Sequence, residues 1–366
     1  MSPIFFSKHT AKKQQGLSLI ELLVAMFITT IIFAGVINTF LTTKQSYVFS
    51  EQMSYMQENA RFAMDSISRD LRLAGYYGGC AVKGSAQAVA ITVNNQPNFV
   101  GINPVEGFEV GGHPAEYSAN VRVAVSSPDS IIVRYSTSEG NLSVNSHVPP
   151  VVTVNANHGF DAGKVVVLAE ADCSQLAITS AAVAGTNQIT HALGNNCTSG
   201  LYGDFDCTDT SAADLVTAYP ANSTLSEFVA KAYYIGRSSA DDTMPALFVQ
   251  NLNDTGGLTA EELVPGVEDL QIVYGVDTNP TTSDGNINRY VNNITTDTAD
   301  AGSGWVGWGR VLAVRIQLVV VSRDPVLLTT TSQTPIPGGT TYDDRFMRQL
   351  VTTTVQMRNA VLVSNQ

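Results

Sequence analysis

The stretch that decides the fold lies near the N-terminus and reads Lys12-Lys-Gln-Gln-Gly16-Leu-Ser-Leu-Ile-Glu21-Leu-Leu-Val-Ala25. No residue from Leu22 to Thr43 carries a charge. As a helix, this uncharged run is long enough to cross a bilayer core of about 30 Å. Lysines precede the run and acidic residues dominate after it, so the positive-inside rule places the N-terminus in the cytoplasm. The sequence therefore predicts one membrane-spanning helix that is followed by an exported region.

Two ordinary explanations of the apolar run fit less well. A secretory signal peptide has an apolar region of about 7–15 residues that ends in a small-x-small cleavage site. Here Ile32-Phe33-Ala34 has a bulky residue where a small one is needed. A plain signal anchor does not explain Glu21, because an acid inside an apolar span costs roughly 2–3 kcal/mol or more. Glu21 is therefore a candidate functional residue.

The quoted stretch resembles the type IV prepilin cleavage and N-methylation motif, in which a basic leader ends in glycine before an apolar helix. The resemblance implies that a prepilin peptidase cuts after Gly16 on the cytoplasmic face and methylates the new amino terminus at Leu17. The commoner residue at that position is phenylalanine. The resemblance also implies that Glu21 is required for assembly. A carboxylate and an ammonium that are buried together offset each other's desolvation, so Glu21 would face a neighbour's N-terminus.

The helix is expected to continue beyond the membrane-length run, since no proline occurs between Pro3 and Pro97. Apolar residues then recur at steps of three and four, which predicts a core face that packs on a sheet; they are Met53, Met56, Ala60, Ala63, Met64, Ile67 and Leu71. Arg61, Asp65 and Arg69 are spaced to pair along another face. We expect the helix to run from about Leu17 to Ala74, before a stop at Gly75.

The chain from Tyr76 onward is predicted to form strands and loops. The expected strands are Val89–Val93, Ser130–Tyr135, Lys164–Ala169, Val229–Ile235, Ala246–Gln250, Val267–Val276, Arg310–Ser322 and a last one over 351–358. Their period of two with polar partners favours half-buried antiparallel strands. The expected loops are long and cover 136–162, 194–226 and 277–304. The predicted fold class is α+β and pilin-like: a long N-terminal helix, with a membrane half and an amphipathic half, packed on an antiparallel β-sheet head with long loops.

A second resemblance covers the C-terminal half. The residue blocks Ala232–Gly236, Glu262–Thr278, Val311–Leu318 and Gln349–Asn359 are similar to those of PilW-type minor pilins, and Ala74–Cys80 fits as well. Together the two resemblances imply a leader peptide over 1–16 and a transmembrane assembly helix over 17–75. They imply a periplasmic β-rich head over 76–366, in which 81–228 is a variable inserted region.

The four cysteines are an even number, which fits an oxidising compartment. Three pairings of Cys80, Cys173, Cys197 and Cys207 are possible. We favour Cys197–Cys207 as a short loop clip and Cys80–Cys173 as a tether between the helix exit and the inserted region. A metal site is disfavoured because no CxxC occurs and no histidine stands at ligand spacing.

Charge and motif content argue against nucleic-acid binding and catalysis. The formal net charge is −12, and loss of the leader, with three lysines and no acid, takes it to −15. Phosphate binding needs clustered Lys and Arg, so direct nucleic-acid binding is not expected. His113, His147, His158 and His191 are scattered through predicted loops, and no HExxH, GxSxG or GxxxxGK[ST] occurs. We therefore expect no catalytic residues, no cofactor and no metal.

Three further patterns have more than one interpretation. The stretch Gly302–Gly307 matches G-x-G-x-x-G but precedes a strand, so the match is interpreted as accidental. Trp305 and Trp308 are interpreted as strand-end packing, with a subunit contact as the alternative. The oxygen-rich stretches Asn251–Gly256 and Asp284–Asn288 fit turn chemistry, with Ca²⁺ binding left open.

The sequence thus indicates a PilW-type minor pilin that is made in the bacterial inner membrane with its head in the periplasm and is then packed into a type IV pilus at the cell surface. The resemblance implies that it primes assembly, with twitching motility, adhesion and DNA uptake downstream. It implies prepilin peptidase, other minor pilins, the major pilin and a PilY-type tip adhesin as partners. Two alternatives stay open: a type II secretion pseudopilin of the GspJ type, and a pilus-tip binding module whose 81–228 region recognises a surface or ligand.

Overall fold

The computed structural model describes residues 18–81, 88–94, 99–109, 128–137, 142–201, 205–207, 218–253, 255–278, 285–294 and 308–359. The chain divides into two compact units, residues 1–52 and residues 53–366, and each is treated by itself below.

One long helix, α1 (Leu19–Leu73), comes first and has 55 residues. The carbonyl of Ser18 accepts hydrogen bonds from the backbone N–H groups of Glu21 and Leu22, at 3.0 and 3.1 Å, and so starts the helix. The expected boundaries of about Leu17 and Ala74 agree with these bounds. The predicted stop is confirmed, because Gly75 has a positive φ of 80°, which residues with a side chain rarely adopt.

The largest sheet of the described residues has thirteen strands. In chain order they are β3 (Ala88–Ile91), β4 (Val105–Phe108), β5 (Ser130–Ser136), β6 (Leu142–Val148), β7 (Val151–Val154), β8 (Val165–Ala169), β9 (Gln175–Ser180), β10 (Ala182–Gly185), β11 (Gln188–Thr190), β12 (Phe205–Asp206), β13 (Thr224–Arg237), β14 (Pro245–Leu252) and β15 (Leu258–Pro265). Strand β13 is the hub, because its first residues pair with β6 and β8 and its later residues pair with β5 and β14.

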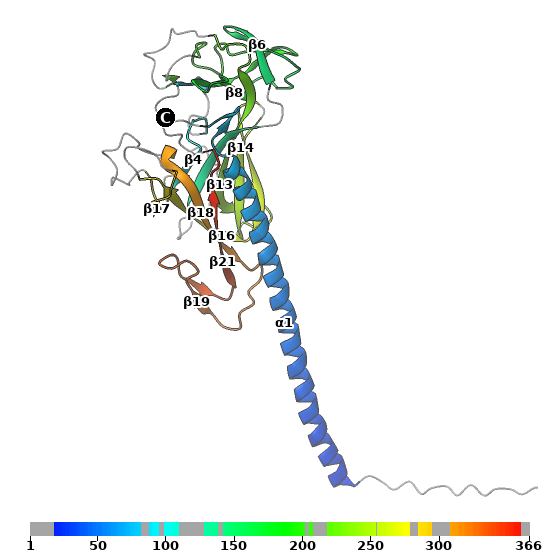
Figure 1. The fold of residues 1–366 in the computed structure, drawn as a ribbon. Coiled ribbons are helices and arrows are strands. Elements are labelled where there is room, and N and C mark those ends of the chain that lie inside the picture. Colours follow the sequence, from blue (N-terminus) through cyan, green and yellow to red (C-terminus); the bar gives the residue numbers. More distant parts are fainter. Residues whose placement is uncertain are drawn as a thin grey trace, which may run out of the picture. The chain divides into compact units, whose positions relative to one another are not determined.

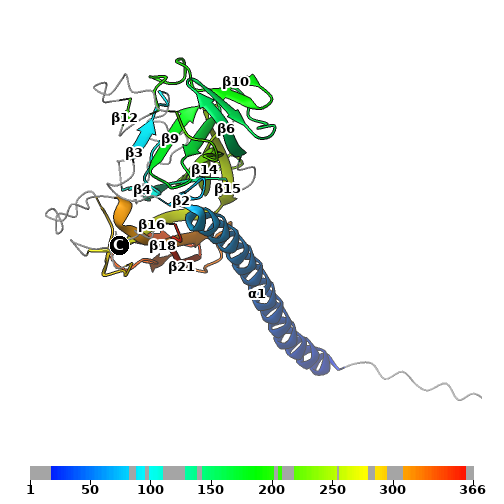
Figure 2. The ribbon, with the colours of Figure 1, turned by 45° about the horizontal axis from the view of Figure 1, so that its top comes forward.

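A second sheet has the strand order β17 (Arg289–Val291), β16 (Val267–Val276), β18 (Val311–Val321) and β21 (Arg348–Gln356). Strands β16, β18 and β21 lie side by side in both views (Figures 1 and 2). Their register places Ile272 opposite Ile316 and Ile316 opposite Thr353. Two small sheets pair β1 (Tyr76–Tyr77) with β2 (Cys80–Ala81) and β19 (Thr331–Gln333) with β20 (Tyr342–Asp344), and a 3₁₀ turn, η2 (Trp308–Arg310), precedes β18.

The alternation along β13 builds two cores. Tyr233 and Ile235 face a core that also contains Ile67 and Leu71 of α1 together with residues of β16 and β18. Tyr234, one position along, faces a second core built with β8, β9 and β14. Successive side chains of a strand point to opposite faces, so one strand supplies both cores.

The predicted strands over 89–93, 130–135, 164–169, 229–235, 246–250, 267–276, 310–322 and 351–358 correspond to β3, β5, β8, β13, β14, β16, β18 and β21. The expected loop over 136–162 is wrong, since β6 and β7 lie within it. Their inward residues include Val144, Val152 and Val154, all about 1% exposed, while intervening Asn and Ser residues face outward. In the loops expected over 194–226 and 277–304, the described residues contain the short strands β12 and β17 and the start of β13. The sheets are mostly antiparallel, with parallel pairs between β3 and both β9 and β12.

Candidate assembly interface

The predicted processing and assembly residues stand at the start of α1. Gly16 and Leu17 lie outside the described residues. Glu21 occupies the first turn of α1 and is exposed. Ser18 and Glu21 have the S-x-x-E spacing of a helix capping box, and a carboxylate in the first turn is favoured by the helix dipole. The glutamate is therefore compatible with the local helix, whatever its role in assembly.

The first half of α1 buries almost nothing within this chain. Every residue from Ser18 to Tyr47 is exposed, including large side chains such as Leu19 at 76%, Phe27 at 68% and Phe33 at 63%. By length and composition, this helix is apolar enough to cross a membrane. A continuous apolar surface of this size needs lipid or protein to cover it.

The threonines of this half are adapted to apolar surroundings. Each of five hydroxyls donates a hydrogen bond to the carbonyl four residues earlier, at 2.7–2.9 Å; they belong to Thr29, Thr30, Thr39, Thr42 and Thr43. An unpaired hydroxyl is costly where no water is present, and back-bonding removes that cost inside the helix itself. The run can therefore contain threonine and still enter a bilayer or a helix bundle.

The amphipathic half of α1 packs on the head as the predicted stripe requires. Its buried apolar residues are at most 7% exposed; they are Met56, Ala60, Ala63, Met64, Ile67 and Leu71. Met53, also predicted for the stripe, is only partly buried. Met56 and Ala60 pack with Val320 of β18 and with Met347. Asn59 adds a hydrogen bond of 2.9 Å from its amide to the carbonyl of Pro265. The charged pair Arg61 and Asp65 lies on the exposed side, 4.0 Å apart.

A buried carboxylate that was not predicted from the sequence holds the C-terminal end of this stripe against the head. Asp70 is 2% exposed and accepts hydrogen bonds from the hydroxyls of Tyr135 and Tyr233, while the ammonium of Lys231 lies 3.0 Å from it. Burial and the nearby Asp70 charge raise the pKa of both tyrosines, so they stay protonated as donors. The signal was available, because Asp70 continues the steps of three and four from Ile67 to Ala74.

The exit of α1 is held by backbone and by a buried arginine. Gly75 donates its N–H to the carbonyl of Arg134 at 3.0 Å, and a Cβ on Gly75 would lie 3.1 Å from a Pro104 side-chain carbon. Arg134 is 1% exposed; its guanidinium donates to the carbonyl of Phe99 at 2.9 Å and to the Glu106 carboxylate at 2.8 Å. These contacts fix where the chain leaves the helix and enters the head.

Two parts of the chain match known protein families. Residues 232–359 match the family described as Type IV Pilus-assembly protein W, and residues 11–37 match the Prokaryotic N-terminal methylation motif. Over residues 232–359, about a third of its length, the chain is similar to the type IV pilus-assembly protein W family. No curated protein and no solved structure matches it. The first match contains β14 to β18 and β21, and the second contains Gly16, Leu17 and Glu21.

This similarity indicates a structural, non-enzymatic pilus component. Its methylation motif implies processing by prepilin peptidase. The apolar half of α1 together with this motif is consistent with anchoring in the inner membrane before incorporation into a pilus.

Two disulfides cross-link the β-rich head. Cys80 is bonded to Cys173, 93 residues away, and Cys197 is bonded to Cys207, 10 residues away. These are the pairings that the sequence analysis favoured among the three possible ones. The longer one ties β2, which follows α1 and β1, to the turn between β8 and β9.

The other candidate residues that the structure describes make packing or turn contacts. Trp308 is 8% exposed and packs edge-on against Tyr274 with ring centroids 5.0 Å apart, as strand-end packing predicts. Asn253 Oδ1 accepts the backbone N–H groups of Thr255 and Gly257, which is turn chemistry. The stretch Gly302–Gly307 and the acids Asp254 and Asp284 lie outside the described residues. Within the described ranges, no group of three or more His, Cys, Asp or Glu side chains could hold a metal ion.

The structure brings together two histidines that the sequence analysis left scattered. His147 Nε2 lies 2.8 Å from His191 Nε2, and both rings are buried. The backbone N–H of Tyr219 donates to His147 Nδ1 at 2.9 Å, so His147 carries its proton on Nε2 and donates it to His191. Burial lowers the pKa of each histidine to about 4. Because Nε2 of His147 is protonated and already donates, the pair is a neutral hydrogen-bonded contact and not a metal site.

Proposed function

We propose that this protein is a minor pilin that is cut after Gly16, methylated on Leu17 and packed through α1 into a type IV pilus, where it primes assembly with other minor pilins. In this proposal, Glu21 pairs with the N-terminal ammonium of a neighbouring subunit. The proposal includes the major pilin and a PilY-type tip adhesin as further partners. Twitching motility, adhesion and DNA uptake are downstream effects of the fibre.

One observation carries the proposal: the same helix is fully exposed over Ser18–Tyr47 and buried along one face from Met56 to Leu71. The buried face is covered by this chain's own sheets, whereas the apolar surface of the exposed half must be shielded from water by other molecules. Lipid covers this apolar surface before assembly, and neighbouring helices of the same kind cover it afterwards. Glu21 is costly in a bilayer and becomes favourable beside an ammonium, which favours the assembled state.

The decisive experiment is the Glu21→Ala variant, expressed in cells that lack the wild-type chain. We expect normal leader removal, measured from the N-terminal peptide by mass spectrometry, but loss of the variant from sheared pili. Glu51→Ala is the matched control, because Glu51 is also an exposed acid of α1 but lies beyond the apolar run. Incorporation of the Glu21 variant at the wild-type level would overturn the assigned role of this residue.

Priming is tested separately from incorporation. Deletion of the protein should reduce the number of surface pili, and mixed expression should restore them in proportion to the processed chain. Unchanged piliation would contradict priming and leave a subunit that is only carried along. The family match over 232–359 favours a pilus over the secretion pseudopilin alternative, and defective protein secretion with normal pili would reverse that preference.

A second candidate, the displayed binding module, is favoured by one surface of the 81–228 region. Strands β6, β7, β10 and β11 and the residues between β6 and β11 contain no Asp, Glu, Lys or Arg except Asp161, Lys164, Glu170 and Asp172, which belong to the turns around β8. Two large apolar side chains of the 81–228 region, Val148 and Leu193, are 72% and 69% exposed. Deleting 81–228 would remove β5 and β8, which pair with β13, so the sharper test is Val148→Asp with Leu193→Asp. Lost adhesion with normal piliation supports the binding module, whereas normal adhesion contradicts it.

A further inference from the structure

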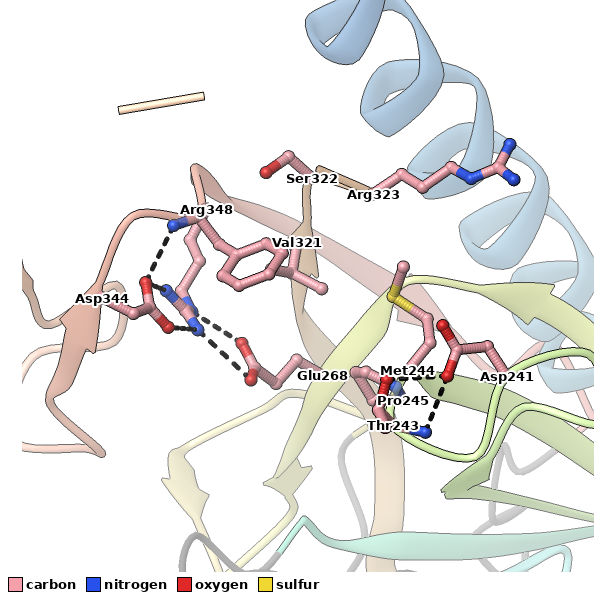
Figure 3. Close-up of a pocket in the computed structure, with 11 residues that line it drawn as sticks. Asp241, Thr243, Met244, Pro245, Glu268, Val321, Ser322, Arg323, Asp344 and Arg348 are labelled. Carbon is pink, nitrogen blue, oxygen red and sulfur yellow. Dashed lines mark hydrogen bonds and ion pairs between the residues drawn. The ribbon is translucent and has the colours of Figure 1, made fainter. Parts of the chain in front are cut away.

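A cavity of about 350 Å³ lies where the starts of β14 and β16 meet the end of β18 and the start of β21 (Figure 3). Its walls combine charged and apolar side chains; they include Asp241, Met244, Glu268, Arg323, Asp344 and Arg348. All of them fall inside the 232–359 stretch that matches the pilus-assembly protein W family. The motif and helix that define the proposed function do not contribute to this cavity.

One wall contains three charged side chains that already bond one another, Arg348, Glu268 and Asp344, and we call this group the charge clamp. The guanidinium of Arg348 bonds Glu268 at 2.6 and 3.3 Å and Asp344 twice at 2.7 Å, as Figure 3 shows. Its flat face covers the ring of Tyr342 at 4.0 Å. Hydrogen bonds from Arg348 hold the pKa of Asp344 below its ordinary value. Two carboxylates against one guanidinium leave this wall with one net negative charge, and each carboxylate keeps lone pairs for a further donor.

A third acid stands on the wall across from this clamp. Asp241 is exposed, and its Oδ1 accepts hydrogen bonds from the N–H and the hydroxyl of Thr243 at 3.0 and 2.7 Å (Figure 3). These bonds lower the pKa of Asp241, so it stays ionised at neutral pH. Counting Arg323 as well, the five charged residues of the lining carry a net charge of −1.

The remaining walls are apolar and decide what kind of cation fits. Met244, Pro245, Val321 and Phe346 supply side chains that favour contact with methylene groups. A bare metal ion is disfavoured, because within the described residues no three ligating side chains come close enough to hold one. An anion is disfavoured by the net charge. An aliphatic stem with a cationic head matches both the acids and the apolar walls.

We propose that this cavity binds a lysine or arginine side chain of a neighbouring pilus subunit. The identity of the partner rests on the proposed function, whereas binding of a cation with an aliphatic stem does not. The methylene stem lies against Met244 and Phe346, and the head is shared between Asp241 and the Glu268–Asp344 pair. An acidic subunit, at −15 after loss of the leader lysines, gains from a neighbour's cation at such a contact.

The chemistry is tested on the full-length protein in detergent micelles. Met244 reports on the cavity through its methyl NMR signal, assigned with Met244→Leu. We expect a saturable shift with Nα-acetyl-lysine methylamide or the arginine analogue at constant ionic strength. The uncharged Nα-acetyl-norleucine methylamide should give none. Asp241→Asn keeps the oxygen that accepts from Thr243 and should weaken binding at most about fivefold, the upper loss expected for one exposed ion pair.

The matched control is Asp343→Asn, which removes an exposed acid of β20 outside the lining and should leave the titration unchanged. No shift with the lysine analogue, or an equal shift with the norleucine analogue, overturns the cation site. A shift produced by Ca²⁺ alone at the same concentration would replace it with a metal site.

The source of the cation is tested in assembled pili. A photo-reactive phenylalanine at Asp242, which is exposed beside the cavity, should cross-link to another pilin at a peptide containing Lys or Arg. Asp241→Asn should reduce this product, and Asp343→Asn should not. Binding in solution with a cross-link that Asp241→Asn leaves unchanged would assign the cavity to a free cation such as a polyamine and overturn the subunit contact. Glu21→Ala, by contrast, abolishes incorporation without altering the Met244 titration, so failure of the two proposals is distinguishable.

Discussion

The carboxylate of Asp70 lies 3.0 Å from the ammonium of Lys231, and this ion pair joins the last turns of α1 to β13, the strand shared by both cores of the head. The two residues are 161 positions apart in the sequence. Lys231 stands opposite Val133 of β5 and Asn251 of β14, so the helix is tied to the middle of the sheet and not to its edge.

We predict that Asp70→Ala lowers the free energy of unfolding of the head by about 3–5 kcal/mol, because it leaves a lysine and two tyrosine hydroxyls without their buried acceptor. Denaturant titration followed by near-UV circular dichroism measures the change. Asp65→Ala is the control, since that carboxylate is 79% exposed and its pair with Arg61 is worth at most about 1 kcal/mol. Equal effects of the two variants would show that the Asp70 contacts add nothing.

We predict that Gly107→Ala destabilises the head by roughly 1–3 kcal/mol or more through overpacking. A Cβ at this position of β4 would lie 1.6 Å from the Tyr274 hydroxyl oxygen and 3.2 Å from a Trp308 ring carbon. Tyr274→Leu in the same chain should recover part of the loss, so the two changes are not additive. Gly309→Ala serves as the control, because a Cβ added there would meet no atom within 4 Å. Strict additivity of the Gly107 and Tyr274 changes would argue against the clash.

We predict that the His147–His191 pair makes the head less stable as the pH falls from about 6.5 to about 4. Burial lowers both folded-state pKa values to about 4, below the unfolded value of 6.5, so the unfolded chain binds more protons in this window. The stabilisation is present above pH 6.5 and is lost on acidification. Replacing both residues with Gln should flatten the dependence of the melting temperature on pH between 4 and 6.5.

The effect of Asp129 on the pH dependence of stability has the opposite sign over a similar pH range, so the experiment needs a control for this residue. Burial raises its folded-state pKa to about 7, above the ordinary value of 3.8, so its contribution is present at low pH and is lost as the pH rises through 7. The histidine effect is therefore the difference between chains that both carry Asp129→Asn. An unchanged pH profile in the histidine variant of that pair would refute the assignment.

We predict that loss of the Cys80–Cys173 disulfide costs more stability than loss of Cys197–Cys207. The two bonds close segments with separations of 93 and 10 residues, for which the chain-entropy model gives about 4.6 and about 2.7 kcal/mol. Paired Cys→Ala variants, measured by denaturant titration under oxidising conditions, test the order. A larger loss for the short loop would mean that the long bond does not restrict the unfolded chain as that model assumes.

The sequence alone predicts the parts of this protein that depend on local spacing. The uncharged run from Leu22 to Thr43, the three-and-four stripe to Leu71 and the stop at Gly75 predict the helix. Strand period two predicts β16 and β18 within a residue. The methylation motif is also a local pattern, because its residues are consecutive in the chain.

The expectations that were wrong or incomplete depend on contacts between distant residues. Strand β6 contains two Ser and one Asn and strand β7 has only four residues, so their pattern resembles a loop until pairing with β13 and β11 satisfies their backbone groups. The spacing places Asp70 on the buried stripe, but only the tertiary structure shows that its partner is Lys231.

What the sequence determines by itself is therefore one long helix, apolar in its first half and amphipathic in its second, and a β-rich head after it, because hydrophobic period and charge placement act over a few residues. What only the tertiary structure decides is which distant side chains meet: Asp70 with Lys231, His147 with His191, and Glu268 with Asp344 around Arg348. Burial then sets the strength of these contacts, because removing water strengthens a paired charge and penalises an unpaired one.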